Sequence, residues 1–532
     1  MCVCSAARTQ RRARSPRAAS DAIVSTSVAT HREVANRPLL VVSIMLATVM
    51  QVIDTTIANV ALPDMQGSLS ATQDQVSWVL TSYIVAAAIA TPATGWLAGK
   101  FGRKHLLGIA IAGFTLASVL CGVAQDIGQM VLFRVLQGIF GAALVPISQS
   151  TLLDVFPREK HGAAMAMWGM GVMVGPILGP PLGGWLTDHY SWHWVFLINV
   201  PVGAVALFGV LASLPADDTR DVRFDLRGFA FLAAGIGALQ LLLDRGEQQD
   251  WFGSLEIQIE LAVALLGFYL YWVHWRTAQR PFLDLGLLRD RSFFAGNLFI
   301  FVIGIVLFAT MALLPPYLQN LMGYPVVTTG LLMAPRGVGT LVAMMTVGRL
   351  LARGVDARAL ILAGLLLTIV SLWQMAHFNA DMPAAPVVWA GVIQGLGLGL
   401  VFVPVSTVAY STLAPSVRTE AAGMFSLVRN IGSSIGISMV TTLLSRNTQV
   451  NHAELASRLT PYAGVPMPPG WNLADPHSLA AINGEVTRQA SAIAFLNDFW
   501  LMMLLTAAAI PLLFLFRRAR VVAAPALPAA EH

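Results

Sequence analysis

Charged side chains are scarce in this chain: 11% of its 532 residues are Asp, Glu, Lys or Arg, whereas 56% are hydrophobic. So few charges cannot keep a protein of this size dissolved in water, which excludes a soluble globular protein. The three cysteines, Cys2, Cys4 and Cys121, offer neither a disulfide framework nor a set of metal ligands. We therefore expect no metal site. The net charge of +5 is not gathered in a basic soluble domain, so we also expect no nucleic-acid partner.

No enzyme motif in this sequence lies in the structural context that its chemistry needs. There is no Walker A sequence, and GLGLG at 395–399 lacks the strand, turn and helix of a nucleotide-binding loop. GSSIG at 432–436 matches the G-x-S-x-G hydrolase pattern, but it lies in an apolar run where close helix packing explains the glycines better. We therefore expect neither an enzyme nor a cofactor, and an ion gradient must supply the energy for any transport.

Long apolar runs fill most of the chain and predict an all-α polytopic membrane protein. The runs lack the alternating pattern of a membrane barrel, so helices are the expected spanning structure. Fourteen candidate spans follow, at about 39–62, 77–97, 105–124, 128–150, 163–187, 193–213, 228–244, 256–275, 293–315, 328–351, 358–377, 386–410, 420–445 and 493–517.

Basic residues fall in alternate connections between these runs, and lysine and arginine in short loops mark the cytoplasmic side. The groups are Lys100, Arg103 and Lys104; Arg158 and Lys160; Arg220, Arg223 and Arg227; Arg276, Arg280, Arg289 and Arg291; Arg349, Arg353 and Arg358; and Arg418. With an even number of spans, both termini are then cytoplasmic. We expect a disordered basic tail at 1–38, with an organellar transit peptide as the alternative, and a second tail at 518–532.

An internal repeat divides the chain. Residues 135–164 resemble 392–422 at an offset near 258, with Val135, Gln137 and Gly138 matching Val392, Gln394 and Gly395. We therefore expect two six-helix halves, at 39–213 and 293–517, with two inserted helices and their linkers at 214–292. Parallel repeats of this kind are typical of transporters that rock around a central substrate site. The one long outward loop is expected at 446–492.

Asp54 lies inside the first apolar run, where a carboxylate is costly and is a functional-site hypothesis by default. Arg134 lies at a similar depth in the fourth run. We hypothesise that the two communicate electrostatically, either as a direct pair or through Gln137 and bound water. Burial disfavours the charged form of an acid and a nearby cation favours it, so motion between states can load and unload a proton. A permanent structural ion pair is the alternative.

Further polar residues in the spans are candidates for a substrate cavity. Arg336 and Arg429 lie inside the tenth and thirteenth runs, and we expect no acid near the middle of any helix of the C-terminal half. This imbalance predicts tolerance of anionic or neutral hydrophobic substrates, although snorkelling or bonds to helix carbonyls would also explain the two arginines. The full set of candidate cavity residues is Gln51, Thr56, Asn59, Gln137, Arg336 and Arg429.

Four motifs then carry a family resemblance: DTTIANVALP (54–63), GWLAGKFGRK (95–104), RVLQGIFGAALVP (134–146) and GVMVGPILGPPLGG (171–184). Together they resemble the major facilitator superfamily, specifically the fourteen-span drug:proton antiporters of the EmrB/QacA type. The resemblance implies the facilitator fold and proton-coupled multidrug efflux of hydrophobic compounds by alternating access. It also implies conformational or gating roles for Gly95, Gly102, Arg103, Lys104, Gly171, Gly175, Pro176, Gly179, Pro180, Gly183 and Gly184. The family usually has an Asp where this chain has Gly99, which puts a charge relay through that loop in doubt.

The resemblance further implies the cytoplasmic (inner) membrane and the lipid bilayer as surroundings. In EmrB-like systems a periplasmic adaptor and an outer-membrane channel complete the pathway. The distal part of the 446–492 loop could form an amphipathic helix with Ile482, Val486 and Ile493 on one side, facing the membrane or a partner. The alternative function is a facilitator transporter of one specific metabolite.

Overall fold

The chain forms a bundle of helices in a computed structural model that describes residues 36–157, 160–215, 219, 223–279, 281–414, 417–459 and 475–516. Within these ranges fourteen helices are long and apolar enough to cross a membrane, which confirms the expected count, and no strand occurs. Most of the two expected tails (1–35 and 517–532) and the middle of the long loop (460–474) lie outside the described residues.

The N-terminal half begins at Asn36, whose side chain caps the first helix by accepting a hydrogen bond from the Leu39 amide. Three of its spans are built from shorter pieces, because the helix breaks at Thr91–Ala93, at Ala142 and Ala143, and at Ile198. Its helices are α2 (Arg37–Ser68), α3 (Gln73–Ala90), α4 (Thr94–Phe101), α5 (Arg103–Gly122), α6 (Ile127–Gly141), α7 (Leu144–Val155), α8 (His161–His189), α9 (His193–Leu197) and α10 (Asn199–Ser213), with η1 (Thr91–Ala93) between α3 and α4.

The inserted pair consists of α11 (Leu226–Arg245) and α12 (Leu255–Thr277). α11 touches both halves: Asp244 accepts a hydrogen bond from Thr81 on α3, and Gln240 donates one to Ser434. α12 packs mainly on α11 and presents large apolar side chains such as Leu265 and Trp272 outward. Such an apolar outer face suits contact with lipid chains.

The C-terminal half repeats the six-span arrangement, starting at Asp290, whose carboxylate caps the first turn. Its helices are α13 (Arg291–Pro316), α14 (Val326–Ala352), α15 (Ala357–Met375), α16 (Ala385–Ser411), α17 (Arg418–Arg458) and α18 (Pro476–Ala508), with two short segments, η5 (Tyr317–Leu321) and η7 (Ile510–Leu515). α8 packs along α14, and η1 and α4 meet α17, so that these contacts join the two halves.

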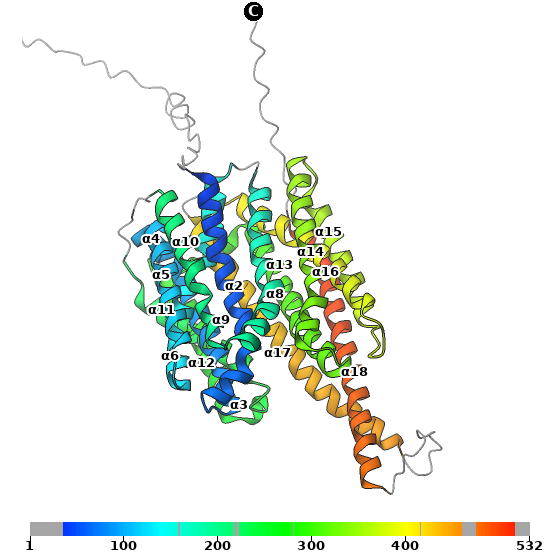
Figure 1. Cartoon of the computed structure of the whole chain (residues 1–532). Coiled ribbons are helices and arrows are strands. Elements are labelled where there is room, and N and C mark those ends of the chain that lie inside the picture. Colours follow the sequence, from blue (N-terminus) through cyan, green and yellow to red (C-terminus); the bar gives the residue numbers. More distant parts are fainter. Residues whose placement is uncertain are drawn as a thin grey trace, which may run out of the picture.

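We call the end of the bundle that holds Arg37, Lys100 and Arg103 the basic end, and the opposite end the hairpin end. At the hairpin end α17 and α18 run antiparallel beyond the rest of the bundle (Figure 1). Much of the expected 446–492 loop is therefore helical, and Ile482 and Val486 are buried within this helix pair, whereas Ile493 is exposed.

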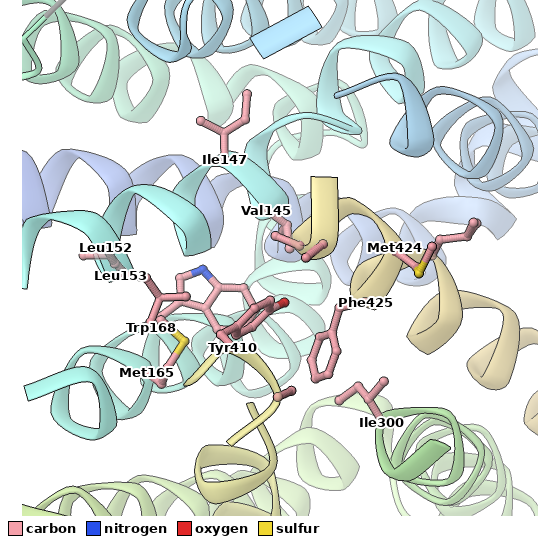
Figure 2. Close-up of a cluster of buried hydrophobic side chains, with 14 of the residues drawn as sticks. Val145, Ile147, Leu152, Leu153, Met165, Trp168, Ile300, Tyr410, Met424 and Phe425 are labelled. Carbon is pink, nitrogen blue, oxygen red and sulfur yellow. The ribbon is translucent and has the colours of Figure 1, made fainter. Parts of the chain in front are cut away.

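The buried core passes from one half to the other towards the basic end. Figure 2 shows Trp168 of α8 beside Tyr410 of α16 and Phe425 of α17, with Val145 of α7 facing them. The rings of Trp168 and Phe402 stack with centroids 5.8 Å apart. The packing of 432–436 and 395–399 also agrees with the sequence interpretation, since the glycines of the first segment lie against the backbone of α13 and those of the second against the backbones of α14 and α15.

Candidate functional site

Asp54 is 0% exposed in α2, and its carboxylate accepts three hydrogen bonds. The Oδ2 atom accepts from Nη1 of Arg134 at 2.6 Å. The Oδ1 atom accepts from Nε2 of Gln137 at 2.8 Å and from Nδ2 of Asn199 at 2.9 Å. The sequence hypothesis offered a direct pair or a link through Gln137, and the structure contains both contacts. These are charge-assisted hydrogen bonds, and their donors come from two helices, α6 and α10.

Arg134 is held in place from several sides. Its Nε donates to the carbonyl of Val79 at 2.8 Å, and its Nη1 also donates to Oε1 of Gln137 at 2.6 Å. The guanidinium lies over the ring of Tyr83, 4.4 Å from the centroid. The Nη2 atom is buried and bonds to no described residue. The two N–H donors of Nη2 are therefore not used by any described residue.

Three residues around Asp54 and Arg134 were not found from the sequence: Ser118 and Asn199, which hydrogen-bond within the group, and Tyr83, whose ring lies against Arg134. Ser118 Oγ accepts from Gln137 at 2.7 Å and from Asn199 at 3.1 Å. Asn199 is the first residue of α10, within the sixth apolar run at 193–213. An asparagine inside such an apolar stretch was the signal that could have identified it. We call Asp54, Ser118, Arg134, Gln137 and Asn199 the Asp54 cluster.

A small polar cavity of about 50 Å³ lies between the halves. Gln51 links it to the Asp54 cluster, because Gln51 lines the cavity and its Nε2 donates to the Tyr83 hydroxyl at 3.2 Å. Drug-sized sites occupy about 300–1,000 Å³, so the halves must separate further to admit such a molecule. The lining residues are Gln51, Ala87, Thr91, Gly141, Ala142, Val145, Pro146, Ser426, Arg429 and Asn430.

The two candidate arginines of the C-terminal half, the buried Arg336 and the half-buried Arg429, have no acidic partner in the described part of the chain. Arg429 lines the cavity, and its Nη2 donates to Asn430 at 3.4 Å while its Nε has no bond. Arg336 lies in α14 and is not among the lining residues, and neither of its Nη atoms has a hydrogen-bond partner. These are two positive charges that nothing described neutralises.

The remaining predicted cavity residues lie elsewhere. Thr56 donates to the carbonyl of Gly175 at 3.2 Å and so belongs to the contact between α2 and α8. Asn59 is exposed on α2, and Gln137 is part of the Asp54 cluster. Neither Thr56 nor Asn59 lines the cavity described above.

The glycine-rich motif of α8 packs directly on α2. A Cβ added at Gly175 would come within 2.5 Å of Val52, and one at Gly183 within 2.9 Å of Ile57. Gly171 and Gly179 lie equally close to Met45 and Thr56. Gly184 has more room, and neither Pro176 nor Pro180 ends α8, which is helical from His161 to His189. The stripe brings the two helices together as the spacing predicts.

At the basic end an acid joins the halves. Asp154 of α7 pairs with Arg103 and, at 2.6 Å, with Arg418 of α17. Gly102 has a φ of 77° between α4 and α5, and a Cβ at Gly95 would come within 2.9 Å of Glu420. Lys104 lies in the first turn of α5. Arg103 thus has an acidic partner on α7, although the loop lacks an acid at position 99.

One expectation about the C-terminal half is wrong. Asp498 is an acid within α18, 22 residues after its first residue, and is 1% exposed. The apolar run begins at 493, so the sequence placed Asp498 near the start of a span, whereas the helix begins at Pro476. Across the described residues no group of His, Cys, Asp and Glu could hold a metal ion.

Comparison with known proteins identifies relatives. Residues 44–437 match the model of the Major Facilitator Superfamily. The chain is 36% identical to the fatty acid resistance protein FarB of Neisseria gonorrhoeae over 89% of this chain and 94% of that protein. It is 36% identical to the multidrug export protein EmrB of Escherichia coli strain K12 over 87% of this chain and 92% of that protein.

A solved structure supports the fold. The human organic anion transporter MFSD10 (TETRAN) superposes with a TM-score of 0.57 over 88% of this chain and 99% of that chain. The two sequences are only 14% identical, so this likeness concerns the fold alone.

Proposed function

We propose that this chain, which belongs to the Major Facilitator Superfamily and is a multi-pass membrane protein, exports hydrophobic compounds in exchange for protons. The observation that carries the proposal is the buried Asp54 cluster, connected to a cavity between the halves through Tyr83 and Gln51. An ionisable pair inside a membrane span is expensive and marks ion pathways and proton relays. The multidrug export proteins among its relatives support the same activity.

In this mechanism Asp54 carries the proton. As a carboxylate it holds Arg134, Gln137 and Asn199, three groups from α6 and α10. A proton on Asp54 removes its charge and replaces an acceptor by a donor, so the bonds to Arg134 and the amides must rearrange. Arg134 also sits on Tyr83, whose hydroxyl bonds to the cavity residue Gln51. Protonation of Asp54 and occupancy of the cavity are thereby coupled through one chain of contacts.

Alternating access then requires the basic end to open and close. In the present arrangement α7 bonds to the C-terminal half through Asp154 to Arg418 and through Gln149 to Tyr410. With the basic end in the cytoplasm, as the distribution of lysine and arginine favours, these bonds close the cavity towards the cytoplasm. The glycine stripe of α8 allows α2 and α8 to move as one body.

The substrates we propose are hydrophobic molecules that are anionic or neutral. Arg429 at the cavity and Arg336 on α14 attract negative charge, and no described carboxylate neutralises them. A dication placed beside them would be repelled. The name of the relative FarB, which refers to fatty acid resistance, agrees with a carboxylate substrate.

We place the protein in the cytoplasmic (inner) membrane, with the hairpin end on the outer side. The α17–α18 pair extends beyond the bundle there and is within reach of a soluble partner. A periplasmic adaptor and an outer-membrane channel are the partners we propose. Site-specific crosslinking from Val450, an exposed residue of α17, to a co-expressed adaptor tests this contact, and a crosslink obtained equally from the basic end would contradict it.

The function itself is tested in proteoliposomes of the full chain. An imposed pH gradient should drive uptake of an anionic hydrophobic dye into vesicles whose interior is acidic, and dye movement should collapse the gradient. Counterflow with a panel of dyes distinguishes multidrug export from transport of one metabolite, because a single-substrate carrier exchanges only one of them. Proton-independent dye movement would contradict the proposal.

A further inference from the structure

The C-terminal half holds a buried carboxylate that the coupling through Asp54 does not use. Asp498 is 1% exposed, and neither of its oxygens has a hydrogen-bond partner in the described part of the chain. Its neighbours along α18, Phe495 and Phe499, pack against the ring of Tyr317, with centroids 5.6 and 6.4 Å apart. Asp54 has three donors in the same kind of interior, whereas Asp498 has none.

The internal repeat gives Asp498 a counterpart. Phe196-Leu-Ile-Asn199 at the start of α10 corresponds to Phe495-Leu-Asn-Asp498 in α18 at an offset of 299, which is 498 minus 199. The two helices also pack on corresponding partners: α10 lies against α2 and α5, and α18 lies against α13 and α15. In the C-terminal half, Asp498 therefore occupies the position equivalent to that of Asn199, which contacts Asp54 in the N-terminal half.

The other positions of the cluster have counterparts too. Gln394 Nε2 donates to Thr310 Oγ1 at 3.2 Å, as Gln137 Nε2 donates to Asp54. At the same offset of about 257, Arg134 corresponds to Gly391. The C-terminal half thus keeps the amide, has a hydroxyl in place of the first acid, and lacks the arginine. Its acid lies on the last helix instead.

The corresponding residues of the C-terminal half lack hydrogen-bond donors for two of their side chains. Oε1 of Gln394 and both oxygens of Asp498 are buried acceptors without a described partner. A buried carboxylate that is neither paired nor hydrogen-bonded is strongly disfavoured relative to its neutral form. One proton removes the charge of Asp498 and leaves a neutral carboxyl group in this interior.

We propose that Asp498 is a second proton-binding residue, which takes a proton from water when its surroundings are open and returns it to water on the other side of the membrane. The proposal rests on the proton-coupled transport proposed above. Each transport cycle then moves one more proton than Asp54 alone carries.

The ionisable groups on the elements around α18 do not alter this assignment, because none of them bonds to Asp498 in the described residues. Asn451 of α17 bonds to Ala490, so in an antiparallel pair the ionisable residue of α17 nearest the level of Asp498 is Arg446, which is exposed. The ionisable residues of these elements are Arg291 on α13, Tyr317 on η5, Arg358 on α15, His377 and Asp381 after α15, Arg418, Glu420, Arg429, Arg446, His452, Glu454 and Arg458 on α17, and His477, Glu485 and Arg488 on α18, where Arg488 pairs with Glu485 and Asp381.

Infrared difference spectra of the full chain in lipid nanodiscs, recorded while the pH is raised, test whether Asp498 binds a proton. The wild type should lose a protonated-carboxyl band that is missing from Asp498→Asn and shifted in Asp498→Glu. Asp381→Asn, which removes an exposed acid nearby, is the matched control and should keep the band. An unchanged band in both Asp498 variants would overturn the proposal, and Asp498→Glu decides it if Asp498→Asn does not fold.

The proton-to-substrate ratio tests the role in transport. It is measured in proteoliposomes from the pH gradient that just balances a substrate gradient. The ratio should fall by one proton in Asp498→Asn and remain unchanged in Asp381→Asn. A ratio that Asp498→Asn leaves unchanged would overturn the second coupling site. A wild type that moves no protons at all would contradict the proposed function instead, and the infrared band would still decide whether Asp498 binds a proton.

Discussion

The two halves share one architecture but distribute their charges differently. In the N-terminal half, Asp54 and Arg134 are buried together and nearly every polar atom of their cluster is bonded. In the C-terminal half, the buried Arg336 and the half-buried Arg429 have no carboxylate partner, and the buried Asp498 has no cation, among the residues that the structure describes. A bonded charge pair suits reversible protonation, whereas an unneutralised cation at the cavity, such as Arg429, suits the recognition of an anion. The two halves therefore share one scaffold but differ in how their charges are paired.

The largest effect should come from breaking the pair in the N-terminal half. Arg134→Ala leaves the Asp54 carboxylate buried without a cation, which costs about 3–5 kcal/mol of folding stability. Thermal unfolding in nanodiscs measures this loss. The double variant Arg134→Ala with Asp54→Asn should regain most of the stability, because no buried charge then remains.

Arg458→Ala is the control, since Arg458 belongs to an exposed pair with Glu454 and should cost at most about 1 kcal/mol. If Arg134→Ala destabilises no more than this control, the pair does not stabilise the N-terminal half and the contrast between the halves fails.

The C-terminal half should instead respond to the charge of the substrate. Arg429→Gln removes a charged donor at the cavity and should weaken binding of an anionic hydrophobic compound by about 1.5–3 kcal/mol, which is roughly tenfold or more. A neutral analogue of the same shape should bind with unchanged affinity. Equilibrium binding to detergent-solubilised protein gives both values, and Arg458→Gln should change neither. Equal weakening for both compounds would show that Arg429 only packs.

A smaller effect tests what the halves have in common. Gly175 packs α8 on α2, and Gly432 packs α17 on α13 at the corresponding offset of 257. Alanine at either position meets atoms of the opposing helix within 2.5 Å, so each substitution should cost about 1–3 kcal/mol by overpacking.

Gly484→Ala is the control, because a Cβ there meets nothing within 4 Å and alanine favours a helix over glycine by about 1 kcal/mol. Unfolding temperatures should therefore fall for Gly175→Ala and Gly432→Ala and rise slightly for Gly484→Ala. A fall in only one half would contradict equivalent packing.

The sequence predicted most of the fold because each span is longer and more apolar than a soluble helix needs to be. It also predicted Asp54 and Arg134, since ionisable residues are conspicuous in apolar runs. Ser118 and Asn199 were missed because neutral polar residues occur in many membrane helices without a special role. Only the arrangement of three helices reveals that Asn199 contacts Asp54 and that Ser118 contacts Asn199.

Asp498 was missed for a different reason. Hydropathy locates the apolar part of a helix, whereas α18 starts 17 residues before the apolar run at 493, as 493 minus 476 shows. The apolar run therefore places Asp498 near the start of a span, whereas Asp498 lies deep inside a longer helix, between Phe495 and Phe499. Arg336 was expected at the cavity, but depth within a span does not specify which face of the helix carries a residue.

The most direct measurement compares dye efflux by the wild type and Asp54→Asn in everted membrane vesicles at imposed pH gradients. If Asp54 carries the coupling proton, Asp54→Asn loses efflux driven by the gradient but keeps exchange of dye for dye, because the cavity between the halves remains. Gradient-driven efflux at the full wild-type rate in Asp54→Asn would contradict the account.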